Sequence, residues 1–182
     1  MQMHGHTAAV HALHQLPNGD GSLIVSCSAD GAVRLWCLAT LRCVRVLLGH
    51  SAAVLCAVPV PLPPLTADTP SSEPPPELFT GAADGTLRGW AGACGGWGSG
   101  GGGDGLRCGA VAAGLVPAAH EGEIYAVCVS GTELVSAGKD GQLRLWSAAT
   151  LRPTGMLGAP RAHRAPPRSP RSPPPSRSHA PP

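Results

Sequence analysis

The chain has 182 residues, including 20 Pro and 25 Gly, and a formal net charge of +2, so it is long enough for one domain with a sizeable core. Residues 1–157 carry eight Lys or Arg and eleven Asp or Glu, whereas residues 158–182 carry five Arg and no acid. Because the basic residues in excess lie in this tail, nucleic acid is not expected to bind the body of the chain. No apolar run reaches the ~18 residues of a membrane span, and the N-terminus lacks a signal-peptide pattern. We therefore expect an intracellular protein, cytoplasmic or nuclear, that has no membrane partner.

The seven cysteines show no Cys-x-x-Cys pair and no zinc-ribbon spacing. Two of them, Cys27 and Cys128, lie within apolar runs, where a thiol behaves as a small hydrophobic group. We expect buried free thiols, without disulfides or a metal site.

Short apolar runs bounded by turn residues follow one another along the chain, which is typical of an all-β protein. The expected strands in chain order are 13–16, 23–28, 43–48, 54–58, 78–81, 124–129 and 134–137. Further strands are expected to end at Trp36, Trp90 and Trp146, because an aromatic residue is favoured on a pleated surface.

One pattern occurs three times, in Ser26–Trp36, Thr80–Trp90 and Ser136–Trp146. In each copy a hydroxyl residue lies four positions before an Asp-Gly pair, and Arg and Trp lie four and six positions after the Asp. Asp-Gly between apolar runs is a strong signal for a tight β-hairpin, because Gly tolerates a positive φ. A His precedes the three Trp residues by 30, 40 and 26 positions, so the loops vary while the hairpin register is constant.

These features resemble the WD-repeat β-propeller family, whose units carry Gly-His near the start and Trp-Asp near the end. The resemblance implies three four-stranded antiparallel blades in an incomplete ring, since complete propellers have at least four blades. It also implies that a His, a strand Ser or Thr, the turn Asp and the Trp form a hydrogen-bonded relay within each blade. The relay residues are His6, Ser26, Asp30 and Trp36, then His50, Thr80, Asp84 and Trp90, and finally His120, Ser136, Asp140 and Trp146.

Two positions depart from the family pattern. The Asp of the Trp-Asp pair is absent, because Cys37, Ala91 and Ser147 follow the three Trp residues. Gly89 replaces the Leu that precedes Trp in the other two copies.

The domain organisation follows from the repeats and from the Pro- and Gly-rich stretches. A partial propeller is expected over residues 1–157, with blades at about 4–48, 49–116 and 117–157. A Pro-rich insert over 59–76 and a Gly-rich insert over 92–105 interrupt it, and the basic Pro-, Ser- and Arg-rich tail over 158–182 is expected to be disordered. The tail has three interpretations: a solvated tail, a phosphorylatable or Pro-rich docking segment, or the product of an incomplete or mis-spliced gene model.

Catalytic, metal and cofactor sites are not predicted. The histidines near the N-terminus have no established ligand spacing, and Glu121 and Glu123 indicate a solvated turn. Ser, His and Asp recur three times, whereas an active site is normally unique. No cofactor and no small-molecule substrate are therefore expected.

We expect a non-catalytic scaffold or adaptor that binds proteins or peptides. A substrate-recognition subunit of a ubiquitin-ligase or signalling complex is one alternative, and an RNA-processing factor that uses the Arg/Ser tail is another. Arg34, Arg88 and Arg144 recur on the strands that end in Trp and are either solvent-side charges or a basic arc that faces a partner. Open blade edges predict self-association.

Overall fold

The structure, a computed structural model, describes residues 2–17, 22–60, 76–91 and 111–157. Most of the Pro-rich insert expected over 59–76, and all of the Gly-rich insert and the tail, lie outside the described residues.

The described residues form three four-stranded antiparallel sheets, each built from four consecutive strands. Blade 1 contains β1 (Val10–Gln15), β2 (Leu23–Ser28), β3 (Val33–Cys37) and β4 (Arg42–Leu47). Blade 2 contains β5 (Val54–Pro59), β6 (Leu78–Ala82), β7 (Leu87–Ala91) and β8 (Val111–Val116). Blade 3 contains β9 (Ile124–Ser130), β10 (Glu133–Gly138), β11 (Leu143–Ser147) and β12 (Pro153–Leu157). The expected all-β class and the expected three four-stranded antiparallel blades are confirmed.

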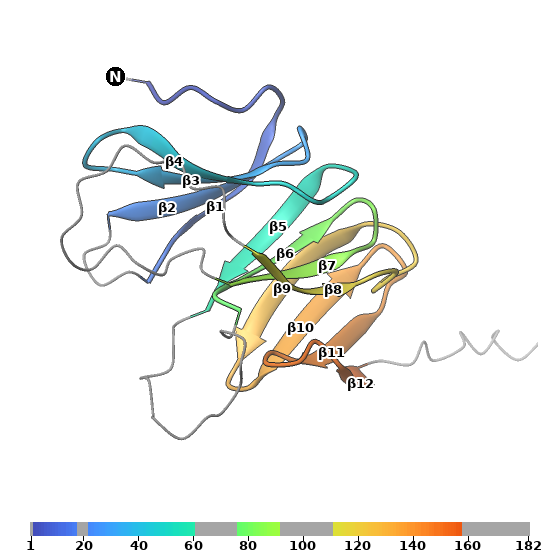
Figure 1. Cartoon of the computed structure of the whole chain (residues 1–182). Coiled ribbons are helices and arrows are strands. Elements are labelled where there is room, and N and C mark those ends of the chain that lie inside the picture. The colour runs from blue at the N-terminus through green and yellow to red at the C-terminus, as the bar shows by residue number, and fades with distance from the viewer. Residues whose placement is uncertain (1, 18–21, 61–75, 92–110, 158–182) are drawn as a thin grey trace, which may run out of the picture.

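The three sheets follow one another in chain order along an arc, and the first strand of each blade lies beside the first strand of the next (Figure 1). β5 contacts both β1 and β9, so blade 2 lies between blades 1 and 3. The arc does not close into a ring within the described residues.

Each Asp-Gly pair forms the turn between the second and third strands of its blade. Gly31, Gly85 and Gly141 have φ values of 79°, 74° and 73°, a conformation that residues with a Cβ rarely adopt. The turns place Ser26 opposite Arg34, Thr80 opposite Arg88 and Ser136 opposite Arg144.

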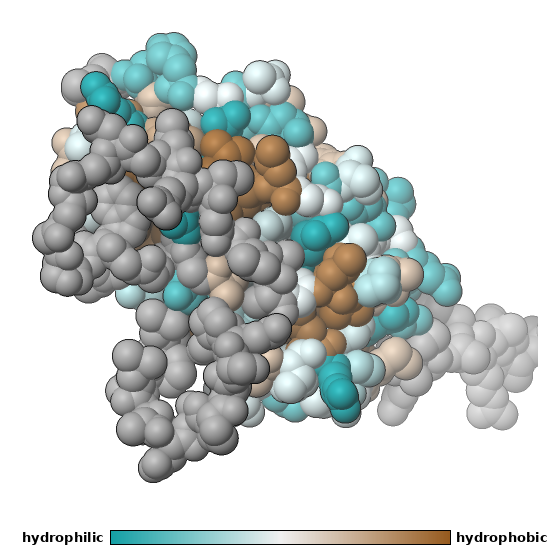
Figure 2. Space-filling view, viewed as in Figure 1, coloured by the Kyte–Doolittle hydropathy of each residue, from teal (hydrophilic) through white to brown (hydrophobic). Residues whose placement is uncertain are grey.

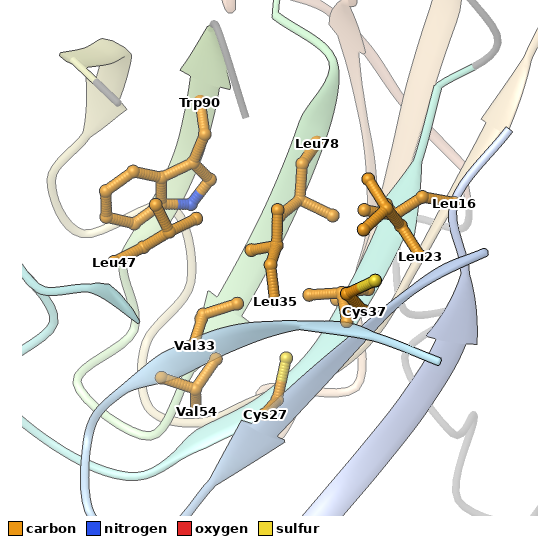
Figure 3. Close-up of a cluster of buried hydrophobic side chains, with 12 residues drawn as sticks. Leu16, Leu23, Cys27, Val33, Leu35, Cys37, Leu47, Val54, Leu78 and Trp90 are labelled. Carbon is orange, nitrogen blue, oxygen red and sulfur yellow. The ribbon is translucent and has the colours of Figure 1, made fainter. Parts of the chain in front are cut away.

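Two apolar clusters hold the blades together. The cluster between blades 1 and 2 includes Val33, Leu35 and Leu47 from blade 1 and Leu78 and Trp90 from blade 2, as Figure 3 shows. A second cluster joins blades 2 and 3 and contains Phe79, Leu87, Ile124, Leu134, Trp146 and Leu151. Each fully buried Leu, Ile, Val or Phe stabilises the fold by about 1.5–3 kcal/mol.

Gly89, which departs from the repeat pattern, lies where side chains from both blades meet. A Cβ at this position would lie 3.0 Å from Phe79 Cε1, 3.2 Å from Pro76 Cβ and 3.3 Å from Leu151 Cδ1. Since these atoms already occupy the space, Gly permits the packing of blade 3 against blade 2.

The thiols follow the expectation only in part. Cys27, Cys37 and Cys56 are buried, and burial raises the pKa of Cys27 and of Cys56 to about 12. The expectation was wrong for Cys128, which is exposed, and Cys43 is only half-buried. Cys128 lies on the face of β9 turned away from blade 2, where no further blade of the described chain covers it.

The described part of the chain contains no helix that is long and apolar enough to cross a membrane.

Candidate functional site

In blade 1 the loop before β1 is joined to the hairpin between β2 and β3 by a chain of side-chain hydrogen bonds. His6 Nδ1 lies 2.8 Å from Asp30 Oδ2, and His6 Nε2 lies 2.7 Å from Ser26 Oγ. The indole Nε1 of Trp36 donates to the same Ser26 Oγ at 2.7 Å. The structure thus brings together the four residues that the sequence places in the first repeat.

Blade 3 has the same arrangement. His120 Nδ1 lies 2.9 Å from Asp140 Oδ1, and His120 Nε2 lies 2.7 Å from Ser136 Oγ. Trp146 Nε1 donates to Ser136 Oγ at 2.9 Å.

Blade 2 differs at its histidine. His50 Nε2 lies 2.8 Å from Thr80 Oγ1, which also accepts from Trp90 Nε1 at 2.9 Å. His50 Nδ1, however, lies 2.8 Å from Thr86 Oγ1, and its distance to Asp84 Oδ1 is 3.6 Å. The Thr86 hydroxyl bridges the gap by donating to Asp84 Oδ1 at 2.6 Å.

One assignment of protons satisfies every group in these chains. Trp donates its N–H to the hydroxyl oxygen, the hydroxyl donates to Nε2 of a neutral His, and Nδ1–H of that His donates onward. The final acceptor is the carboxylate in blades 1 and 3 and the Thr86 hydroxyl in blade 2. Because Ser26, Thr80 and Ser136 are buried, an unpaired hydroxyl there would cost free energy, whereas each of these is paired.

The turn carboxylates also bind the backbone of the loop that follows each His. Asp30 Oδ2 accepts from Thr7 N at 3.1 Å, and Asp84 Oδ2 accepts from Ser51 N at 2.8 Å. Asp140 Oδ2 accepts from Glu121 N at 3.2 Å. Each carboxylate therefore fixes a loop as well as a turn.

These hydrogen bonds change the acidity of the carboxyl groups. Burial raises the pKa of Asp30, but the hydrogen bonds from His6 and from backbone N–H groups outweigh it and lower the pKa to about 2. Burial likewise opposes the hydrogen bonds from Thr86 and Ser51 at Asp84, and the pKa is again about 2. The same balance lowers the pKa of Asp140, so all three groups are ionised near neutral pH.

Burial lowers the pKa of His50 to about 4. The charge of Arg88 adds to this shift, whereas the charge of Asp84 opposes it. The neutral imidazole required by the proton assignment is thus the form present at pH 7.

The recurring arginines do not occupy one common environment. In blade 1 a Cβ on Gly5 would lie 3.2 Å from Arg34 Nη1, and in blade 2 a Cβ on Gly49 would lie 2.9 Å from Arg88 Nη1. The guanidinium groups therefore fill the space beside the Gly that precedes each His. Among the described atoms, the buried Nε groups of Arg34 and Arg88 have no hydrogen-bond partner.

Arg144 is held differently, because Ala119 replaces Gly before the third His. Its Nη1 donates to the Ala119 carbonyl at 2.7 Å, and its Nη2 lies 3.2 Å from Asp140 Oδ2. All three arginines are half-buried, and a basic arc that faces a partner stays a prediction.

The order Ser–His–Asp does not supply a nucleophile in these blades. Each hydroxyl is buried, its hydrogen is directed at His, and its oxygen accepts from Trp, so the hydroxyl is not accessible to a substrate. Among the described residues no group of three or more His, Cys, Asp or Glu side chains is arranged to hold a metal ion.

Sequence reasoning missed Thr86. The residue after Asp-Gly is Ala32 in blade 1 and Gln142 in blade 3, so the repeat pattern carries no signal at this position. A hydroxyl residue directly after the turn was the only available sign that it could reach back to the carboxylate, as turn hydroxyls often do.

Three four-stranded blades, each with its loop hydrogen-bonded to its hairpin, define a β-propeller architecture built from repeats. The family described as "WD domain, G-beta repeat" matches residues 1–37, 41–91 and 115–147, and the chain belongs to this WD-repeat family. Members of this family generally act as protein-interaction scaffolds.

A relative, Nuclear distribution protein PAC1-2 of Uncinocarpus reesii (strain UAMH 1704), is 41% identical over 56 residues. The similar segment covers 28% of this chain and 12% of that protein. The chain therefore matches a small part of the length of this relative.

Proposed function

We propose that the protein is a non-catalytic scaffold that binds other proteins or peptides through the loops at one end of its blades. The observation that carries this proposal is that the turn of one blade contacts the loop of the next blade. A Cβ at Gly31 would lie 3.4 Å from the Ala52 carbonyl oxygen, and one at Gly85 would lie 2.8 Å from the His120 carbonyl oxygen. The turn of one blade thus lies against the loop of the next.

These loops expose side chains while their backbone is held. Ser51 and Glu121 are exposed, although the backbone N–H of each donates to a turn carboxylate. The Ser51 hydroxyl also donates to Asp84 Oδ2, at 3.0 Å. A fixed backbone with exposed, variable side chains is suited to recognition, because little conformational entropy is lost on binding.

The test is proximity labelling with the full chain in cells, followed by mass spectrometry of the labelled proteins. The charge-changing pair Ser51→Arg and Glu121→Arg should remove most of the enriched partners. Thr154→Arg is the matched control, because Thr154 is also exposed but lies on β12. Enrichment no greater than with an unrelated bait, or partners unaffected by the pair, would refute loop-mediated binding.

The identity of the enriched proteins distinguishes the more specific functions. Ligase or signalling subunits would identify the chain as a substrate-recognition component of such a complex. RNA crosslinks that require residues 158–182 and weaken steeply with salt would identify an RNA-processing factor instead.

An intracellular location, cytoplasmic or nuclear, is part of the same proposal. The free thiols of the described cysteines support it, because thiols persist in reducing compartments. So does the similarity to a protein named for nuclear distribution. Fractionation of cells that express the tagged chain should recover it with cytosolic or nuclear markers and not in the medium.

Self-association is the last component of the proposal. It is supported by apolar sheet surfaces on the first and last blades that no other described residue covers.

A further inference from the structure

The two faces of each blade make different contacts with the neighbouring blades. The side that carries the Trp is here called the upstream face, and the opposite side is called the downstream face. The upstream face of blade 2, with Trp90 and Leu78, packs on the downstream face of blade 1, with Val33 and Leu47 (Figure 3). Blade 3 packs on blade 2 in the same sense, through Trp146 and Leu134.

No other blade of the described chain covers the upstream face of blade 1. Val10, four residues after His6, is 53% exposed, whereas Val54 and Ile124, four residues after the other two histidines, are 0% exposed. Leu13 on the same face is 60% exposed. A hollow of about 340 Å³ lies here, lined by both residues and by Ile24 and Trp36.

The downstream face of blade 3 likewise has no neighbouring blade among the described residues. Leu143, three residues before Trp146, is 42% exposed, whereas the matching Val33 and Leu87 are 0% exposed. Leu157, which pairs with Leu143, is 52% exposed, although Leu47 at the matching place in blade 1 is 3% exposed.

The hairpin turns show the same difference. The turn glycines of blades 1 and 2, Gly31 and Gly85, lie against the loop after the His of the following blade. Gly141, the turn glycine of blade 3, has no described atom within 4 Å of a Cβ placed on it.

The sequence Ala-Thr-Leu-Arg occurs in two turns, at residues 39–42 of blade 1 and 149–152 of blade 3. The burial of the Leu in the two turns is a fourth comparison between these blades. Leu151 of blade 3 is buried, and it lies 2.5 Å from a Cβ placed on Gly114 of blade 2. Leu41, in the same turn of blade 1, is only half-buried. Gly155, at the place in blade 3 that matches Gly114, has no described neighbour within 4 Å of its Cβ position.

Figure 2 shows hydrophobic side chains in separate patches, not spread over the whole visible surface. Apolar area on soluble proteins is informative when it is confined and matched to a partner surface. Here both surfaces are present on the same chain. Among the described residues, blade 1 has no neighbour on its upstream face, and blade 3 has none on its downstream face.

We propose that a second copy of this chain binds head-to-tail, with its blade 1 upstream face on the blade 3 downstream face of the first copy. Leu143 and Leu157 of one copy cover Val10 and Leu13 of the other. The Gly141 turn meets the loop after His6. This inference names the surfaces of the self-association proposed above and does not depend on the scaffold role.

The contact is heterologous, since two different patches meet, and a heterologous contact ends growth only when the copies form a ring. Two copies that each use both faces form such a ring. We therefore expect a closed pair, with a mass twice the 18.3 kDa of one chain.

The first test is the mass of the full chain by light scattering over a range of concentrations. The wild type should reach the pair mass, whereas Leu143→Asp and Val10→Asp should each reduce it to the mass of one chain. Leu115→Asp is the matched control: Leu115 is 46% exposed but lies on the outer strand of blade 2, so its substitution should leave the pair intact.

Mixing the two monomeric variants provides the decisive measurement. The Leu143→Asp chain retains its upstream face and the Val10→Asp chain retains its downstream face, so an equimolar mixture should form a pair through one contact. Far-ultraviolet circular dichroism of each variant checks that it is folded. A wild type that stays at the mass of one chain refutes self-association altogether. If the pair survives either substitution, or if the two variants do not pair when mixed, the proposed faces are wrong. Self-association would then use another surface.

Discussion

At the scale of single residues, the three histidines make the same bond at Nε2 and different bonds at Nδ1. His6 and His120 reach their turn carboxylates directly, whereas His50 reaches Asp84 through the Thr86 hydroxyl. The resemblance to the WD-repeat family predicts the first two connections. It does not predict the third, because the bridging position is occupied by Ala and Gln in the other copies.

Two substitutions at Thr86 separate the hydroxyl from the volume of the side chain. Thr86→Val keeps the volume and leaves His50 Nδ1–H without an acceptor, so it should reduce the free energy of unfolding by about 1–3 kcal/mol. Thr86→Ala restores the residue type of blade 1, where His6 meets Asp30 directly, and should cost less than about 1 kcal/mol. Urea unfolding of both variants measures the difference. Equal losses would show that His50 cannot approach Asp84 when the hydroxyl is removed.

The lowered pKa of His50 predicts a dependence of stability on pH. The folded state keeps this group neutral down to about pH 4, whereas the unfolded chain binds a proton below the ordinary pKa of 6.5. The stabilisation is therefore complete above pH 6.5 and is lost as the pH falls towards 4, by roughly 3 kcal/mol in total.

Denaturant unfolding at steps between pH 7 and pH 4.5 measures this loss. His50→Asn should flatten the pH dependence in this window. This window lies above 3.8, the ordinary pKa of the turn carboxyls Asp30 and Asp84. Their pKa of about 2 in the fold causes a separate loss of stability only at lower pH. A His50→Asn chain with an unchanged slope would assign the dependence to other groups.

At the scale of strands and turns, most of the fold was predictable from short-range pattern. The Asp-Gly turns, the alternating apolar residues and the Trp at a constant distance specify each hairpin and its register. The expected second strand of blade 1, 23–28, has the observed bounds of β2. The burial of Leu151 was not predictable, because it depends on two glycines, Gly89 and Gly114, on a different blade.

The two Ala-Thr-Leu-Arg turns permit a matched test of this contact. Leu151→Ala should reduce the free energy of unfolding by about 2–5 kcal/mol, because the side chain fills a space between two blades. Leu41→Ala removes the same atoms from a half-buried position and should cost markedly less. Both Leu have a positive φ, 56° and 55°, so backbone strain does not distinguish them. The comparison requires thermal unfolding at dilutions where light scattering shows single chains, and equal losses would contradict the packing argument.

At the scale of the whole molecule, exposed Cys128 reports on the downstream face of blade 3. The background chain carries Cys43→Ser, because Cys43 is half-buried, and Cys94→Ser and Cys108→Ser, because both lie outside the described residues. In this chain a thiol reagent should modify Cys128 quickly and Cys27 and Cys56 only on unfolding. Pairing should slow the modification of Cys128 as concentration rises. Leu143→Asp is the control that should keep the fast rate at every concentration, and a rate independent of concentration in the wild type would contradict burial of this face.

The position of blade 2 between two neighbours has a consequence for local unfolding. Within the part of the chain that the structure describes, its sheet has a blade on both faces, whereas blades 1 and 3 each have a blade on one face. Opening blade 2 must therefore separate it from both neighbours, whereas an outer blade can open alone at a lower free energy. In native-state hydrogen exchange, the backbone amides of β6 should consequently retain their protons longer than those of β2 and β10. Pairing of chains would remove this ranking, because each outer blade would then gain its second neighbour.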